Sequence, residues 1–154
     1  MSIKSFTESA IILYKRNKYN EALSLACIAI DACSAKIYPN ISQNSERYKK
    51  FLSDYFRVIC TYGFPGIIAD NIHIKVNAKI ENLRLDDYGY VSMEQIIYHV
   101  LRCGLIHDCM IDETIQFTEE TIIGDWNEDK FLIPKALIWG LIATIQECMR
   151  NYNE

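Results

Sequence analysis

The chain has 154 residues, of which 50% are hydrophobic and 23% are charged, and its formal net charge at pH 7 is -4. This composition is typical of a single globular domain over residues 1–154 and excludes an intrinsically disordered chain. The acidic balance argues against a protein that binds nucleic acid broadly through a basic surface. Two short runs of basic residues, at positions 15–18 and 47–50, are interpreted as solvated helix faces.

Several features indicate the cellular compartment. No apolar run reaches the roughly 18 residues that a membrane-spanning helix needs, and residues 1–8 lack the pattern of a secretory signal. The six cysteines form no Cys-x-x-Cys pair, and most lie among apolar residues, as expected for buried, reduced thiols. We therefore expect a cytoplasmic protein that does not contact a membrane.

Apolar residues recur at helical spacing in five segments, which we predict to be helices: residues 5–16, 19–37, 46–62, 92–108 and 134–150. Pro39 ends the second of these helices, and Pro134 suits the first position of the last. The fold class that follows is mainly α, with an antiparallel bundle of about five helices.

Short segments between the helices have the composition of strands. Residues 72–76 alternate between apolar and polar side chains, which predicts one strand. Residues 114–117, 121–123 and 130–133 are predicted to be strands as well, with a turn at residues 125–128. We therefore expect a small β-hairpin between the fourth and the last helix.

The predicted helix over residues 92–108 is the most informative segment. On a helical wheel its apolar residues lie on nearly all sides, so neighbouring elements should bury it. Arg102 lies within it, and a guanidinium cannot shed its charge in an apolar interior. Arg102 must therefore meet an acidic partner, a subunit interface or an anionic ligand. Candidate acidic partners on other helices are Asp31, Glu46 and Asp54.

Two further residues of this helix are candidates for special roles. His107 shares one side of the wheel with Arg102 only loosely, although the long arginine side chain can close the gap. Gly104 costs about 1 kcal/mol relative to alanine inside a helix, which predicts close approach by another backbone. Cys103 and His107 are four residues apart, but two ligands do not make a metal site, so no metal or other cofactor is expected.

The Arg102-x4-His107 spacing, the flanking residues 98–108 and the early helix over residues 21–31 resemble the HEPN superfamily (higher-eukaryote and prokaryote nucleotide-binding domains), in its bacterial R-x4-H form. The resemblance covers most of the chain. It implies a helical bundle that forms a homodimer through the motif helices, with Arg102 and His107 as catalytic residues of metal-independent RNA cleavage. The implied partners are RNA or a nucleotide, a second copy of the chain, and an antitoxin or phage-defence protein.

The implied chemistry begins with attack by the 2′-hydroxyl of RNA on the adjacent phosphate, which leaves a 2′,3′-cyclic phosphate. His107 would transfer protons, since imidazole has an ordinary pKa of about 6.5. Arg102 would hold the phosphate and stabilise the charge of the transition state.

One residue departs from the HEPN pattern, because many HEPN nucleases have a polar residue, often asparagine, where this chain has Cys103. Two functions therefore stay open. One is an endoribonuclease of the toxin or phage-defence kind. The other is a non-catalytic HEPN-like module that binds a nucleotide, an RNA or a protein in assembly or regulation, which Cys103 and the acidic net charge favour. A helical-repeat scaffold would need a second copy of the segment at 19–29, and a serine hydrolase would need a Gly-x-Ser-x-Gly motif; the sequence has neither.

Overall fold

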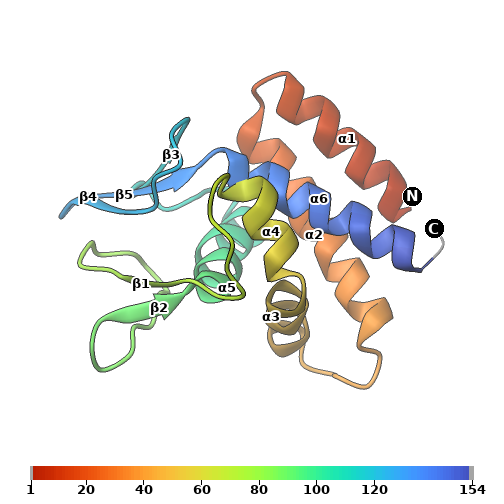
Figure 1. Cartoon of the computed structure of the whole chain (residues 1–154), viewed down its shortest axis with the longest axis horizontal. Coiled ribbons are helices and arrows are strands. Elements are labelled where there is room, and N and C mark those ends of the chain that lie inside the picture. The colour runs from red at the N-terminus through yellow and green to blue at the C-terminus, as the bar shows by residue number, and fades with distance from the viewer. Residues whose placement is uncertain (1, 153–154) are drawn as a thin grey trace.

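Six α-helices, two π-helical segments and five short strands make up residues 2–152, the part of the chain that the computed structural model describes. The α-helices are α1 (Ile3–Lys15), α2 (Tyr19–Ile37), α3 (Asn44–Asp54), α4 (Phe56–Gly63), α5 (Met93–Gln95) and α6 (Ala136–Asn151). The π-helical segments are η1 (Ile96–Arg102) and η2 (Gly104–Asp108), and the strands are β1 (His73–Lys75), β2 (Tyr90–Ser92), β3 (Ile115–Thr118), β4 (Gly124–Asn127) and β5 (Lys130–Pro134). The strands extend from one end of the helical bundle, and both termini lie at the other end (Figure 1).

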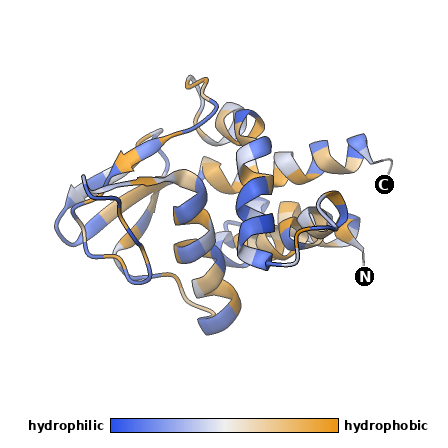
Figure 2. Ribbon diagram, turned by 90° about the horizontal axis from the view of Figure 1, so that it is seen from below, coloured by the Kyte–Doolittle hydropathy of each residue, from blue (hydrophilic) through white to orange (hydrophobic). Residues whose placement is uncertain are grey.

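The core of the helical bundle forms around α6, which packs against α1, α2 and α4. Apolar residues concentrate where these helices meet, whereas hydrophilic residues are frequent in the hairpins (Figure 2). Gly140 lets α6 lie close to α4, because a Cβ at this position would be 2.7 Å from the carbonyl oxygen of Ile59. Within residues 2–152, no helix combines the length and apolar character that crossing a bilayer requires.

The mainly helical fold is confirmed, with one correction to the bundle. The predicted helices over residues 5–16, 19–37, 92–108 and 134–150 are present within a few residues. The predicted helix over 46–62 is wrong as a single element, since it divides at Tyr55 into α3 and α4. The aromatic ring of Tyr55 stacks on that of Phe51, with 4.7 Å between the ring centroids. The division allows α4 to follow the surface of α6.

The strands form two sheets. β1 and β2 pair antiparallel, whereas β5 lies between β3, to which it is parallel, and β4, to which it is antiparallel. The predicted hairpin between the fourth and last helices is confirmed as β4–β5. The predicted strand at 121–123 and the turn at 125–128 are wrong, because β4 occupies residues 124–127. The sequence did not reveal β2, whose pairing partner lies about fifteen residues away along the chain.

The cysteines are all free among the described residues. Cys27, Cys33, Cys60 and Cys148 are buried, as expected, whereas Cys103 is half-buried and Cys109 is exposed. Cys109 has a φ of 55° and lies at the left-handed end of η2, so it ends the helix that contains Arg102.

Candidate functional site

The helix that contains Arg102 and His107 consists of α5, η1 and η2, and we call residues 93–108 the motif helix. Its hydrogen bonding is of the π type over most of its length, a rare arrangement that is frequent at functional sites. Ile96, Ile97 and Leu101 on this helix are fully buried, which confirms that neighbouring elements cover most of its sides. The side that they leave open is therefore informative about function.

Arg102 meets an acidic partner inside the protein. Its Nη2 donates a hydrogen bond to Oδ2 of Asp31 on α2 over 2.8 Å, and its Nε donates to the same oxygen over 3.2 Å. The guanidinium also lies over the ring of Tyr98, 5.3 Å from the centroid. Burial acts to lower the pKa of Arg102, but the hydrogen bond and the charge of Asp31 outweigh it and raise the pKa. Of the three candidate acids, Asp31 is thus the partner.

Gly104 is used for close approach of another backbone, as its place in the helix predicted. A Cβ at this position would lie 2.4 Å from the carbonyl oxygen of Met110, well inside contact distance. The backbone N–H of Met110 donates to the carbonyl oxygen of Gly104 over 3.2 Å. The chain that leaves the motif helix therefore folds directly back onto it.

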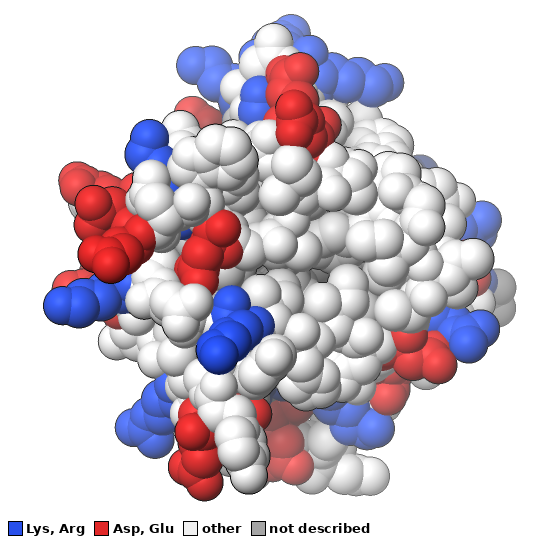
Figure 3. Space-filling model, turned by 60° about the vertical axis from the view of Figure 1, so that its left-hand side comes forward, with Lys and Arg blue, Asp and Glu red and all other residues white. Residues whose placement is uncertain are grey.

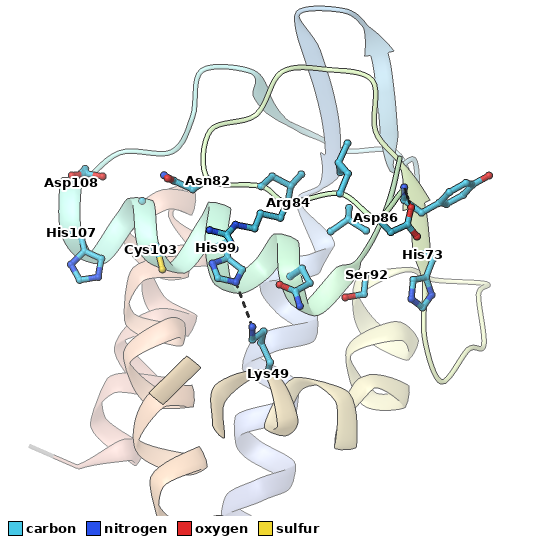
Figure 4. Close-up of a pocket in the computed structure, with 16 residues that line it drawn as sticks. Lys49, His73, Asn82, Arg84, Asp86, Ser92, His99, Cys103, His107 and Asp108 are labelled. Carbon is cyan, nitrogen blue, oxygen red and sulfur yellow. Dashed lines mark hydrogen bonds between the residues drawn. The ribbon is translucent and has the colours of Figure 1, made fainter. Parts of the chain in front are cut away.

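The open side of the motif helix carries a row of four polar side chains, Gln95, His99, Cys103 and His107, spaced every four residues. In an α-helix each step of four residues would rotate by about 40° beyond a full turn. The wider π-helical turn removes this excess. His99, Cys103 and His107 accordingly project from the same side of the helix (Figure 4).

This row forms one wall of a pocket of about 1020 Å³, which we call the motif-helix pocket. The other walls come from Lys49 of α3, from His73 of β1, from the loop at residues 82–86, and from residues 90–92 of β2. All three histidines of the chain line it. No single element supplies the pocket, so the folded domain must assemble it.

Three groups that can carry positive charge converge in this pocket: Lys49, Arg84 and His99, which we call the basic cluster. The Nζ of Lys49 lies 3.5 Å from Nε2 of His99. Arg84 reaches across the motif helix so that its guanidinium lies beside the same imidazole (Figure 4). Burial lowers the pKa of His99, and the charges of Lys49 and Arg84 lower it further. Within the described residues, neither Lys49 nor Arg84 forms an ion pair with a carboxylate.

The loop that carries Arg84 is fastened at several points. The carboxylate of Asp125 accepts hydrogen bonds from the backbone N–H groups of Asn77 and Ala78, over 2.7 and 3.1 Å. Asp112 accepts one from the N–H of Glu81 over 2.9 Å. These contacts connect the loop to the segment that precedes β5, and they place Arg84 above the motif helix.

Two carboxylates, Asp86 and Asp108, line the pocket on opposite sides of the basic cluster (Figure 4). Asp86 accepts hydrogen bonds from the backbone N–H groups of Tyr90 and Tyr88, both over 2.9 Å. These bonds, that from Tyr90 above all, lower the pKa of Asp86 and keep it ionised. The negative charges thus lie at the two ends of the pocket and the positive charges in its middle.

The structure does not bring the two predicted catalytic residues together. His107 is exposed and lines the motif-helix pocket, whereas Arg102 is turned inward to Asp31 and is not part of the pocket wall. Cys103 and His107 both line the pocket, but no group of three or more potential metal ligands occurs among residues 2–152. The catalytic assignment of Arg102 and His107 stays a prediction.

Sequence reasoning missed Lys49 and Arg84. Lys49 belongs to the run at 47–50 that was interpreted as a solvated face, and only its neighbour Lys50 fits that interpretation, with an exposed ion pair to Asp54 at 3.2 Å. The four-residue spacing of Gln95, His99, Cys103 and His107 was the one available signal of a shared face. An ideal α-helical wheel spreads these residues too widely for that signal to stand out.

Comparison with protein families gives a match to the model of the Rv1289 family over residues 2–153, so the chain belongs to this family. Searches of curated proteins and of solved structures gave no match.

Proposed function

We propose that this member of the Rv1289 family is a HEPN-like binding module, whose motif-helix pocket binds RNA or a nucleotide through a phosphate group. The observation that carries the proposal is the convergence of Lys49, Arg84 and His99, in which neither permanent cation forms an ion pair with a carboxylate of residues 2–152. The proposal corresponds to the non-catalytic alternative that the sequence left open.

The physical argument concerns repulsion. Burial and the charges of Lys49 and Arg84 disfavour the protonated state of His99, so the empty cluster opposes a third positive charge in the pocket. A bound anion removes the repulsion and receives hydrogen bonds from an ammonium, a guanidinium and an imidazole. A titratable group in a pocket whose pKa is shifted by neighbouring charges, as that of His99 is, is characteristic of binding and catalytic sites.

The rest of the pocket suits a nucleoside. Tyr90 offers a partly exposed aromatic ring for stacking with a base, and Asn82, Ser92 and Gln95 offer hydrogen-bonding groups for base or sugar. A volume of about 1020 Å³ is at the upper end of small-ligand sites. The pocket can therefore hold a phosphate together with an attached nucleoside.

The face of the molecule seen in Figure 3 does not offer a broad basic surface for RNA. On the face seen in Figure 3, lysine and arginine side chains are scattered among acidic ones, with a wide uncharged area between them. This distribution agrees with the net charge of -4. Binding that depends on one small site, instead of many phosphate contacts, should lose affinity only moderately as salt increases.

The direct test is isothermal titration calorimetry of the purified protein with adenosine 5′-monophosphate and with adenosine. We expect heat of binding with the nucleotide and a much weaker signal with the nucleoside. The Lys49→Gln and Arg84→Gln variants should lose nucleotide binding, whereas Lys50→Gln, which removes the same charge from the same helix outside the pocket, should keep it. Equal binding by all four proteins, or binding by none, would refute the proposal.

The endoribonuclease that the HEPN resemblance implies is a second candidate, favoured by the exposure of His107 on the wall of the same pocket. In this reaction the 2′-oxygen attacks the adjacent phosphorus and the 5′-oxygen leaves. A base accepts the proton of the 2′-hydroxyl and an acid protonates the leaving oxygen, which gives a 2′,3′-cyclic phosphate and a 5′-hydroxyl. His107 would serve one of these proton transfers.

Within one chain, the geometry gives this reaction little help. Arg102 is engaged by Asp31, and His99 and His107 are eight residues apart, which corresponds to about 12 Å along an α-helix and somewhat less along a wider one. The two imidazoles project from the same side of the helix without pointing toward one another, so in this arrangement they do not converge on one phosphate (Figure 4). Cleavage would therefore need the composite site of a homodimer formed through the motif helices, and an antitoxin or defence-system partner belongs to this candidate alone.

A cleavage assay separates the two candidates. Purified protein and its His107→Ala variant would be incubated with mixed RNAs without divalent metal, and the ends of any products identified. Cleavage by the unchanged protein alone, with cyclic phosphate ends, would establish the nuclease. Sedimentation velocity of the same samples would show whether activity requires a dimer.

A further inference from the structure

We propose that the ligand of the motif-helix pocket carries a terminal phosphate monoester, as a nucleotide or the phosphorylated end of an RNA does, and that a phosphodiester within a strand is a poor ligand. This inference rests on the proposed function and names the chemical class that the pocket selects. Two independent features support it: the number of positive groups in the basic cluster, and the positions of the two carboxylates.

The first feature is the match of charge and donors. A phosphate monoester carries a charge of about -1.5 to -2 at pH 7 and presents three terminal oxygens. The basic cluster offers two permanent cations, Lys49 and Arg84, and His99 as a third group that can take up a proton. A phosphodiester has one negative charge and two free oxygens, so it would leave part of the repulsion in the cluster uncompensated.

The second feature is the placement of negative charge. Asp86 and Asp108 lie at the two ends of the pocket, on either side of the basic cluster (Figure 4). A strand that ran through the pocket would bring its neighbouring phosphates toward these carboxylates, and like charges repel. A terminal phosphate has a neighbouring phosphate on one side at most, and a mononucleotide has none. The ends of the pocket therefore disfavour a continuous strand that its middle could bind.

The test compares short RNAs of one sequence with a 5′-phosphate, with a 3′-phosphate, or with hydroxyl groups at both ends, alongside adenosine 5′-monophosphate. Binding would be measured by calorimetry in a buffer free of phosphate. We expect at least one phosphate-terminated RNA to bind about tenfold more tightly than the hydroxyl-ended RNA, since hydrogen bonds to charged groups contribute this much. Binding of the mononucleotide but of neither phosphorylated RNA would restrict the class to free nucleotides.

Three variants make the comparison specific. Arg84→Gln should remove the preference for the phosphorylated ligand, and Arg84→Lys should restore part of it. Asp108→Asn should strengthen binding of the hydroxyl-ended RNA more than that of adenosine 5′-monophosphate, because a mononucleotide brings no second phosphate toward Asp108. Thermal unfolding of each variant would confirm that it is folded.

The outcomes separate this inference from the proposed function. If hydroxyl-ended and phosphate-ended RNAs bind equally tightly and Arg84→Gln weakens both, the pocket binds nucleic acid but the terminal-phosphate inference is wrong. If neither RNA nor mononucleotide binds, the proposed function itself fails.

Discussion

The guanidinium of Arg102 on the motif helix and the carboxylate of Asp31 on α2 form an ion pair, with Nη2 and Oδ2 2.8 Å apart. Their side chains are only 11% and 23% exposed, and the second oxygen of Asp31 is buried without a hydrogen-bond partner among the described residues. An arginine with this environment joins α2 to the motif helix. It therefore stabilises the element that carries His99 and His107, without itself lining the pocket.

The Asp31→Asn variant should lower the free energy of unfolding by about 3 kcal/mol, because removing one member of a shielded pair leaves the other charge without a partner. Chemical denaturation followed by circular dichroism would measure the change. Asp70→Asn is the matched control, since Asp70 pairs with Arg57 at the surface and its loss should change stability little. A similarly small effect of Asp31→Asn would contradict the structural role of the pair.

The Gly104→Ala variant should be less stable than the unchanged protein, even though alanine favours helices more than glycine does. The added Cβ would lie 2.4 Å from the carbonyl oxygen of Met110. Because this oxygen belongs to the backbone, the chain around Met110 or the motif helix itself would have to move. A loss of about 1–3 kcal/mol is expected from such overpacking. Cys103→Ala at the neighbouring position is the comparison. Gly104→Ala as stable as the unchanged protein would show that the approach of Met110 is not close.

The free energy of unfolding of the protein without ligand should depend on whether His99 is protonated. Burial, Lys49 and Arg84 lower the pKa of His99 below its ordinary value of 6.5. Between these two pKa values the unfolded chain binds more protons than the folded one, so stability should rise with pH and level off above about 6.5. Denaturation curves from pH 5 to 8 should show this rise, and His99→Gln should reduce it. Carboxylates with lowered pKa values, such as Asp86, change the stability only at pH values more acidic than this range.

Removal of a cation from the basic cluster should have opposite effects on stability and on binding. In a phosphate-free buffer acidic enough to protonate His99, Lys49→Gln should melt at a slightly higher temperature than the unchanged protein, because it relieves the repulsion that Lys49 exerts on Arg84 and on the imidazolium of His99. It should also lose the stabilisation that added nucleotide gives. If Lys49→Gln melts lower, the contact of Lys49 with the ring of Tyr98, 5.7 Å from its centroid, is the more important role of this residue.

Local patterns predicted the helices well and the strands only in part. The segments that became α1, α2 and α6 have long amphipathic or apolar patterns, which determine a helix without reference to distant residues. By contrast, β3 pairs in parallel with β5, and β2 pairs with β1 across a long loop. Such pairings depend on the packed fold, so alternation within a short segment could not reveal them.

The candidate site also has some features that the sequence predicted and others that only the fold reveals. That Arg102 must meet an acidic partner, a subunit interface or an anionic ligand followed from burial alone, and Asp31 was among the three acids considered. The approach of a backbone to Gly104 followed from its cost in a helix. The basic cluster, however, joins residues 49, 84 and 99 from three separate elements. Only the fold brings them together, and only π-helical hydrogen bonding aligns His99 with His107.

The most direct measurement of phosphate binding in the motif-helix pocket is nuclear magnetic resonance of the histidine rings during titration with adenosine 5′-monophosphate. We predict that the signals of His99 shift in a saturable manner and that the pKa of His99 rises when the nucleotide is bound, since an anion offsets the charges of Lys49 and Arg84. The Arg84→Gln variant should respond weakly. Unchanged His99 signals and an unchanged pKa at saturating nucleotide would contradict the assignment of this pocket as a phosphate site.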